Sequence, residues 1–124
     1  MSRIPLAVLG CALIAGCATQ KAYEGPSRSA RDLAVIQGSP RFNAGLPLVP
    51  SIRKVDDVVV HVGYSQVTVV PGTHRLLVDC VMSETHSTTR HELNVEVYSG
   101  RRYVLVAESG PGNRRCGSVH LEER

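Results

Sequence analysis

Polar and apolar residues alternate with a period of two over much of the second half of the chain. In residues 92–97, Leu93, Val95 and Val97 alternate with polar side chains. Successive side chains of a strand point to opposite faces, so this pattern predicts a strand with one face in a core. No long stretch places apolar residues at the i, i+3, i+4 and i+7 positions of an amphipathic helix. We therefore expect an all-β domain.

Valine-rich runs bounded by turn residues extend this pattern along the chain. Turn signals such as Asp56-Asp57 and Pro71-Gly72 separate the runs. The expected strands are residues 33–37, 52–55, 58–62, 66–70, 75–82, 92–97, 102–108 and 116–122. Residues 38–50 are rich in proline and are expected to form an irregular loop or an edge segment. About seven short strands with closely spaced turns predict a small antiparallel sandwich or a partly open barrel.

Residues 1–16 have the layout of a secretory signal. Arg3 is the only charged residue before Lys21, and the apolar run of residues 4–14 ends in the small pair Ala15 and Gly16. The run has roughly half of the ~20 residues that a helix needs to span a bilayer. We therefore expect this segment to direct export and then to be removed.

The segment Leu13-Ile14-Ala15-Gly16-Cys17 resembles the lipobox of bacterial lipoproteins. The resemblance implies cleavage between Gly16 and Cys17 and transfer of a diacylglyceryl group to the Cys17 thiol. Two or more acyl chains anchor a protein stably, whereas a single chain gives marginal binding. The resemblance thus implies the membrane as a partner. Because Ala18 rather than aspartate follows the cysteine, it also implies the periplasmic face of the outer membrane.

Two alternatives to this anchor stay open. One is an ordinary signal peptide with an incidental cysteine, and the other is modification at Cys11, where the bulky Leu9 stands at a position that needs a small residue. With Cys17 as the modified residue, the expected parts are a signal peptide over 1–16, a lipidated cysteine and polar tether over 17–32, and a single β-domain over 33–124. Cleavage removes Arg3 and leaves 13 basic against 11 acidic residues. This balance does not indicate a nucleic acid as partner.

Cys80 and Cys116 remain once Cys17 is acylated and Cys11 is removed with the signal peptide. In an oxidising compartment, two cysteines in a small domain predict one disulfide. A metal pair or two buried free thiols are the alternatives. Cys116 does not share the alternation of Val119 and Leu121, so it lies either at the rim of its strand or beside a bulge at Gly117.

A second resemblance covers the residues from Val55 to Val78. The turn Val55-Asp56-Asp57, the valine-rich run after it and the segment Pro71-Gly72-Thr73-His74 resemble the small PEGA-type sandwich modules of bacteria. The resemblance implies a non-catalytic envelope domain. It also implies that His74 is a structural residue at the start of a strand.

The segment Ser99-Gly100-Arg101-Arg102-Tyr103 is similar to the Ser-Gly-x-x-Tyr motif of periplasmic lysozyme inhibitors. That family also consists of small disulfide-bearing β-barrel lipoproteins, in which a loop blocks the cleft of the enzyme. The similarity makes Ser99, Gly100, Arg101, Arg102 and Tyr103 a candidate interaction loop.

The five histidines make metal binding a further alternative, because imidazole is a common ligand of zinc and copper. No two of them stand at i and i+2 on one expected strand, and solvent-facing or hydrogen-bonded histidines are the simpler interpretation. His86, in the expected loop at 83–88, and His91, just after it, are the first candidates. No cofactor is otherwise indicated.

The pattern does not indicate an enzyme. Ser65 lies in no strand-turn-helix nucleophile elbow, and the chain has no glycine-rich loop of the kind that holds phosphates. The leading expectation is an envelope-anchored lipoprotein with a structural or protein-interaction role and an unknown envelope protein or cell-wall partner. A lysozyme-inhibitor-like protein and a histidine-based metal-binding protein are the alternatives.

Overall fold

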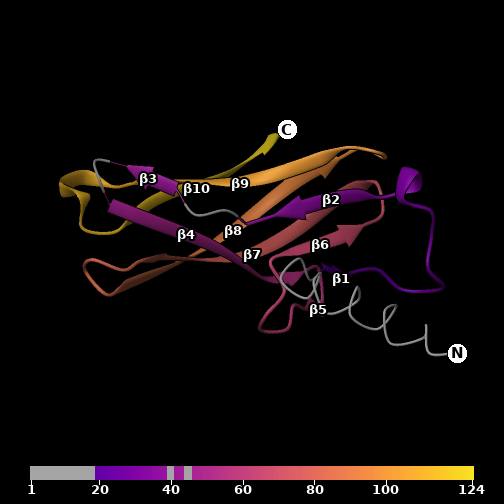
Figure 1. The fold of residues 1–124 in the computed structure, drawn as a ribbon, viewed down its shortest axis with the longest axis horizontal. Coiled ribbons are helices and arrows are strands. Elements are labelled where there is room, and N and C mark those ends of the chain that lie inside the picture. Colours follow the sequence, from indigo (N-terminus) through magenta and orange to yellow (C-terminus); the bar gives the residue numbers. More distant parts are fainter. Residues whose placement is uncertain (1–18, 39–40, 44–45) are drawn as a thin grey trace, which may run out of the picture.

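Two β-sheets pack face to face around a common apolar core in the computed structural model, which describes residues 19–38, 41–43 and 46–124 (Figure 1). The chain in these ranges forms ten strands and two short 3-10 helices. The sheets do not close into a barrel, so the sandwich alternative is confirmed. Within the described residues no helix is long and apolar enough to cross a membrane.

The first sheet has the order β1-β6-β2-β9-β10. Its strands are β1 (Thr19–Lys21), β6 (Gln66–Val69), β2 (Ala34–Gln37), β9 (Arg102–Ser109) and β10 (Cys116–Glu123). The pairs β1-β6 and β2-β9 are parallel and the other pairs are antiparallel. The first sheet of this sandwich is therefore mixed rather than antiparallel throughout. β2 inserts between β6 and β9, which follow it much later in the chain, and a hairpin turn joins it to neither.

The second sheet is antiparallel throughout and has the order β3-β4-β7-β8, with β5 added beside β4. Its strands are β3 (Arg41–Asn43), β4 (Leu46–Val55), β5 (Val58–Val59), β7 (Gly72–Met82) and β8 (Ser87–Val97). β7 and β8 pair along their full length, from Gly72 opposite Val97 to Met82 opposite Ser87. The 3-10 helices η2 (Ala30–Asp32) and η3 (Pro111–Asn113) lie in the connections before β2 and between β9 and β10.

The inner faces of both sheets supply the core, as the alternation predicts. On β7, Leu76, Val78, Cys80 and Met82 are fully buried, while the residues between them face outward or are half-buried. The first sheet covers this row with buried side chains of β2, β6 and β9, among them Ile36, Val67, Val69, Leu105 and Ala107. β9 lies between β2 and β10 and has apolar residues on both faces, which confirms its prediction as an interior strand.

Residues 46–50 form the start of β4, although they were expected in an irregular loop or an edge segment. Proline lacks the N–H that a ladder uses, so it fits a strand only where no partner needs that group. Pro50 lies opposite Cys80 of β7, in a stretch where β4 has, among the described residues, no strand on its other side. The edge alternative does hold for β3, which lies at the border of its sheet.

Two further strands differ in length from the prediction. β8 begins at Ser87 rather than at residue 92, because the polar residues before Leu93 pair with the end of β7 in a long hairpin. β5 ends at Val59 rather than at Val62. The residues after Val59 leave the sheet and form a loop in which Val60 is buried in the core while Val62 and Tyr64 are exposed.

The chain joins the sandwich earlier than the predicted domain boundary at residue 33. Thr19, Gln20 and Lys21 form β1, which pairs with β6, and the Ala22 N–H donates to the carbonyl of Thr68. Ala22 is buried in the core. Residues 19–22, expected in a polar tether, are therefore part of the fold, because a short polar strand satisfies its backbone by adding to a sheet edge even without an apolar pattern.

The outer face of the second sheet carries an ion-pair cluster that joins three strands. The Asp79 carboxylate on β7 is 3.7 Å from Arg53 Nε on β4 and accepts hydrogen bonds from Arg90 Nε and Nη2 on β8, at 2.9 and 3.3 Å. The Asp79 side chain is only 17% exposed. The hydrogen bond from Arg90 lowers the pKa of Asp79 most, burial opposes it, and the charges of Arg90 and Arg53 lower the pKa further.

This cluster predicts a loss of stability in acid. The folded pKa of Asp79 lies below its ordinary value of 3.8, so its stabilising contribution is present above that value and is lost as the pH falls through the folded pKa. Replacing Asp79 by Asn should remove a contribution of about 1 kcal/mol or less, because both arginines are exposed. The free energy of unfolding, measured by denaturant titration between about pH 5 and pH 2, should then fall less steeply for the variant.

Arg90→Ala, which removes the main partner of Asp79, should flatten the acid dependence in the same way. The charge on Asp79 would have no role in acid stability if the curves of Asp79→Asn and the wild type ran parallel over this pH range.

Candidate functional site

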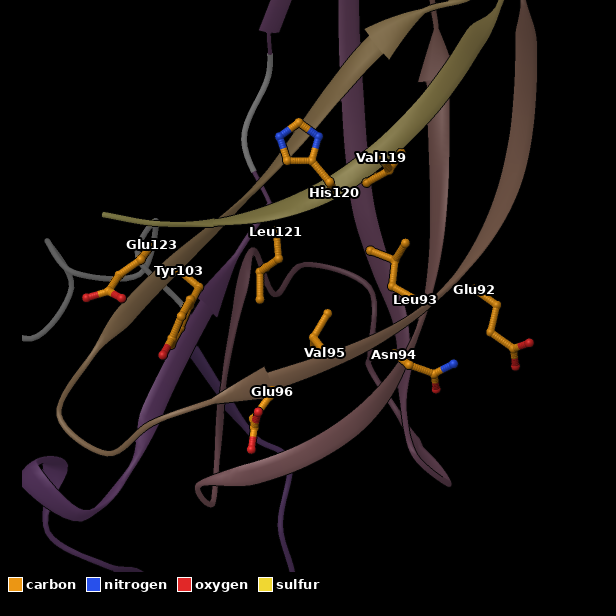
Figure 2. A pocket seen from close by; sticks show the side chains of 10 residues that line it. All are labelled: Glu92, Leu93, Asn94, Val95, Glu96, Tyr103, Val119, His120, Leu121 and Glu123. Carbon is orange, nitrogen blue, oxygen red and sulfur yellow. The ribbon is translucent and has the colours of Figure 1, made fainter.

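Two sheet edges lie next to each other on one side of the sandwich. β8 ends the second sheet and β10 ends the first, and a cleft of about 550 Å³ lies between them (Figure 2). We call it the β8–β10 cleft. Its lining residues come from β8, β9 and β10 and are Glu92, Leu93, Asn94, Val95, Glu96, Tyr103, Val119, His120, Leu121 and Glu123.

The floor of the β8–β10 cleft is apolar. Leu93 and Val95 point from β8 toward Leu121 on β10 (Figure 2), and all three side chains pack against the core while staying partly exposed. Alternation turns these residues inward, but the edge position of their strands leaves the inner face incompletely covered. Val119 and Tyr103 lie deeper and are buried. The cleft therefore exposes core-type side chains that no other described element covers.

The rim of the β8–β10 cleft is acidic. Glu92 lies 3.5 Å from Arg75, and Glu123 accepts a hydrogen bond of 2.8 Å from Arg101. The charge of Glu96 raises the pKa of Tyr98, which lies just beyond the end of β8. Because arginines of this chain already pair with Glu92 and Glu123, Glu96 is the rim carboxylate that favours a partner with apolar side chains and a lysine or arginine.

The backbone of the edge strands adds a second recognition feature. In the described residues, β8 pairs with β7 alone and β10 with β9 alone. The outer side of an edge strand presents N–H and C=O groups that an additional strand can pair with. An extended segment that enters the β8–β10 cleft can therefore combine backbone pairing with apolar contacts to the floor.

The candidate interaction loop Ser99–Tyr103 forms the tight connection between β8 and β9. Gly100 has a φ of 75°, and its N–H donates to the Leu33 carbonyl at 2.8 Å. Tyr103 is 6% exposed, and its hydroxyl accepts a hydrogen bond from the Tyr98 N–H at 2.9 Å. The tyrosine of the motif thus belongs to the core and the wall of the β8–β10 cleft, while the other four residues of the loop are exposed. The lysozyme-inhibitor interpretation stays a prediction.

The two candidate metal ligands lie on the β7–β8 hairpin. His86 is in the exposed turn with a φ of 54°, and His91 on β8 lies with its Nε2 2.8 Å from the Thr89 hydroxyl. Among the described residues, no three histidine, cysteine, aspartate or glutamate side chains are arranged to hold a metal ion. Within the described part of the chain, His86 and His91 therefore belong to no group of three such ligands.

His74, the residue that the PEGA resemblance implies to be structural, is buried at the third position of β7. Its Nδ1 lies 2.7 Å from Asp56 Oδ2 and its Nε2 lies 2.6 Å from the Val70 carbonyl oxygen. Asp56 also accepts the Arg75 N–H at 3.0 Å. Burial raises the pKa of Asp56, but the hydrogen bonds from Arg75 and His74 outweigh it and lower that pKa. The ring thus fastens the β4–β5 turn to the start of β7.

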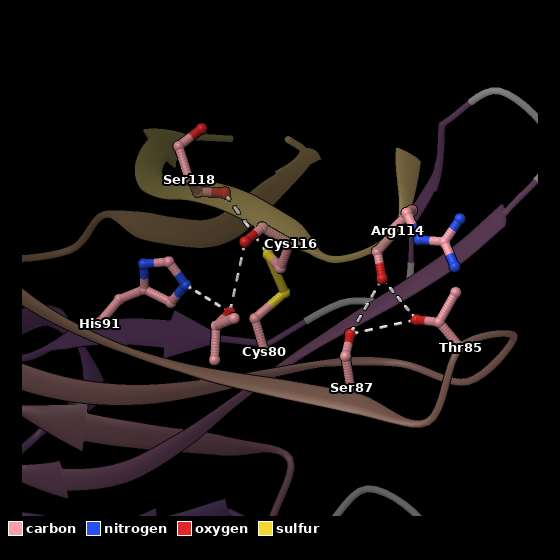
Figure 3. The surroundings of a disulfide bond; sticks show 8 residues. Cys80, Thr85, Ser87, His91, Arg114, Cys116 and Ser118 are labelled. Atoms are coloured by element: carbon pink, nitrogen blue, oxygen red, sulfur yellow. Dashed lines mark hydrogen bonds between the residues drawn. A yellow bond between two sulfur atoms is a disulfide. The ribbon is translucent and has the colours of Figure 1, made fainter. Parts of the chain in front are cut away.

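The predicted disulfide between Cys80 and Cys116 is confirmed, with the Cα atoms 6.1 Å apart (Figure 3). It joins β7 of the second sheet to β10 of the first. The bulge alternative for Cys116 is also confirmed, because the register of β10 on β9 shifts between Cys116 and Ser118 and Cys116 is buried. A Cβ on Gly117 would come within 2.6 Å of the Gly110 Cα, so this bulge needs glycine.

The neighbourhood of the disulfide is polar on its hairpin side. The Arg114 carbonyl accepts hydrogen bonds from the Thr85 and Ser87 hydroxyls (Figure 3), at 2.5 and 3.3 Å. The Thr89 hydroxyl donates to the Cys116 carbonyl at 3.4 Å. The β7–β8 hairpin is thereby connected to the start of β10 by hydrogen bonds as well as by the disulfide.

The predicted lipidation and cleavage residues Gly16 and Cys17, with the rest of the expected signal, lie outside the described residues. Comparison with protein-family models, with curated proteins and with solved structures finds no match for this chain. The candidate site therefore stands on its own geometry. Sequence reasoning missed the β8–β10 cleft, because Leu93 and Val95 carry the same alternation as fully buried strand residues.

The disulfide closes a loop of 36 residues. In the chain-entropy model, reducing a bond across a loop of this length lowers the free energy of unfolding by about 4 kcal/mol. We expect urea titrations of the oxidised and the reduced protein to show this difference. The double variant Cys80→Ala, Cys116→Ala is the control, and its midpoint should not respond to the reductant. Equal midpoints for oxidised and reduced wild-type protein would contradict the stabilising role.

Proposed function

We propose that the protein is a lipid-anchored lipoprotein of the bacterial envelope that acts without catalysis and binds an envelope protein or a cell-wall partner through the β8–β10 cleft. The observation that supports this function best is the apolar floor of Leu93, Val95 and Leu121 between two sheet edges. An added β-strand is the binding mode that uses both features, since backbone pairing supplies affinity and side-chain contacts supply specificity.

The shape of the β8–β10 cleft favours a segment of protein chain over a small molecule. Its volume of about 550 Å³ lies in the range of ligand pockets. However, it lies along two edge strands, and its polar groups, three carboxylates with Asn94 and His120, are spread along these strands. An extended segment with apolar residues facing the floor and a basic residue near Glu96 is the chemical class that fits.

Two observations support the envelope as the site of action. The lipobox-like segment ends at Cys17, two residues before β1 begins at Thr19. The Cys80–Cys116 disulfide suits an oxidising compartment such as the periplasm. With Ala18 after the cysteine, the proposed location is the periplasmic face of the outer membrane.

The anchor predicts a specific response to substitution of Cys17. Cys17→Ala removes the thiol that accepts the lipid, so the protein should keep an uncleaved N-terminus and no mature-mass form should sediment with membranes. Cys11→Ala is the matched control and should leave membrane sedimentation unchanged. Fractionation with mass spectrometry of the intact chain measures both. Membrane sedimentation of the Cys17→Ala protein at the mature mass would contradict the anchor.

The binding mode predicts where a partner is contacted. A photoreactive amino acid in place of Leu93, in the lipidated protein in cells, should form a discrete cross-linked adduct. The same amino acid in place of Thr88, an exposed residue of β8 that does not line the β8–β10 cleft, is the control and should form none. Adding Val95→Glu to the Leu93 reporter should abolish the adduct, because it places a charge on the apolar floor. Equal adducts at both positions, or an adduct that survives Val95→Glu, would overturn the binding site.

A further inference from the structure

An apolar loop projects from the sandwich directly after β5. Residues 60–65 connect β5 to β6, and Figure 1 shows the connection beside β5 at the lower edge of the view. Val62 is 88% exposed and Tyr64 is 42% exposed, and the neighbouring Val59 is exposed as well. Among the described residues, Tyr98 is the other exposed large apolar side chain. Three of these four exposed side chains thus fall within residues 59–64, and exposed apolar side chains that gather in one place mark interaction sites.

Hydrogen bonds from β1 hold the loop in this exposed position. The Gln20 amide donates to the Val59 carbonyl and accepts the His61 N–H, each at 2.8 Å. The Tyr64 N–H donates to the His61 carbonyl at 3.3 Å, and Gly63 has a φ of 101°. The side chains of Val62 and Tyr64 are therefore presented by a defined turn that β1 fastens at its base.

The loop lies where the proposed lipid would enter the membrane. Thr19 begins β1 and pairs in parallel with Gln66, the residue that follows the loop. Cys17 precedes Thr19 by two residues, which span at most about 7 Å even when fully extended. A lipid on Cys17 thus brings the bilayer surface to the start of β1 and to the loop beside it.

We propose that residues 59–64 are a membrane-contact loop, in which Val62 and Tyr64 insert into the headgroup region of the bilayer that holds the Cys17 lipid. This inference rests on the proposed anchor. Valine contributes apolar surface, and tyrosine prefers the membrane interface because its ring is apolar and its hydroxyl is polar. Insertion at a second point beside the anchor fixes the orientation of the domain on the membrane.

That orientation turns the β8–β10 cleft away from the bilayer. β1 and β10 are the two edges of the first sheet and are separated by four strand spacings. At ~4.8 Å per spacing, the anchored edge and the cleft edge lie about 19 Å apart. The membrane-contact loop therefore directs the cleft toward the periplasmic space, where a protein partner can reach it.

The chain contains no tryptophan, so a single introduced tryptophan reports its own surroundings. We would place it at Val62, and in a second variant at Tyr64, in the full-length lipidated protein bound to vesicles of phosphatidylethanolamine and phosphatidylglycerol with brominated acyl chains. Tyr98→Trp, at the turn between β8 and β9, is the matched control. Emission of Val62→Trp and Tyr64→Trp should fall by roughly half or more relative to vesicles without bromine, as expected for insertion ~5–10 Å into the interface. Emission of Tyr98→Trp should not change.

These measurements distinguish failure of the membrane-contact loop from failure of the lipid anchor. Intact-mass measurement of the diacyl group and flotation with the vesicles test the anchor by themselves, and their failure overturns both proposals. Lipidated protein that floats but shows no bromine-dependent loss at positions 62 and 64 overturns the membrane-contact loop alone. Equal quenching at position 98 would overturn the fixed orientation. Contact of the loop with a second copy of the chain would change emission independently of bromine and would also contradict the inference.

Discussion

The Cys80–Cys116 disulfide determines how the open side of the sandwich is built. It ties an interior strand of the second sheet, β7, to the edge strand β10 of the first. β8 pairs with β7 along eleven residues, so β8 and β10 are both attached to β7, one by backbone hydrogen bonds and the other by the disulfide. The β8–β10 cleft lies between these two strands.

The alternation of apolar and polar residues predicted those strands whose apolar side chains are the ones buried between the sheets. β7 and β9 are such strands, and the pairing of the two cysteines agrees with them, since Cys80 shares the inward row of β7. The bulge at Gly117 was also accessible from sequence, because Cys116 broke the alternation of its own strand. In each of these places, only one local structure buries the apolar side chains and the cysteines that the sequence pattern contains.

Prediction failed where backbone pairing, rather than side-chain burial, decides the structure. Residues 19–21 have no apolar pattern, yet they form β1 because β6 offers a free edge. Val62 has the residue type of a strand but lies in a loop. β5 ends at Val59, and the Gln20 side chain, in place of a neighbouring strand, hydrogen-bonds the Val59 carbonyl and the His61 N–H. Strand order cannot be obtained from one sequence, and the β8–β10 cleft exists only because the order leaves β8 and β10 at edges on the same side.

Because the fold begins at Thr19, the domain stays close to its proposed lipid and its orientation on the membrane is restricted. A tether over residues 17–32, as first expected, would allow the domain to move up to about 55 Å from its lipid. With β1 in the sheet, the two residue steps from Cys17 to Thr19 allow about 7 Å, and the domain must lie against the membrane to which the proposed lipid belongs. A domain held so closely benefits from a defined contact face, because an unsuitable polar surface at the bilayer would be desolvated without compensation. The exposed apolar side chains beside β1 meet that requirement, and they do so at the sheet edge farthest from the β8–β10 cleft.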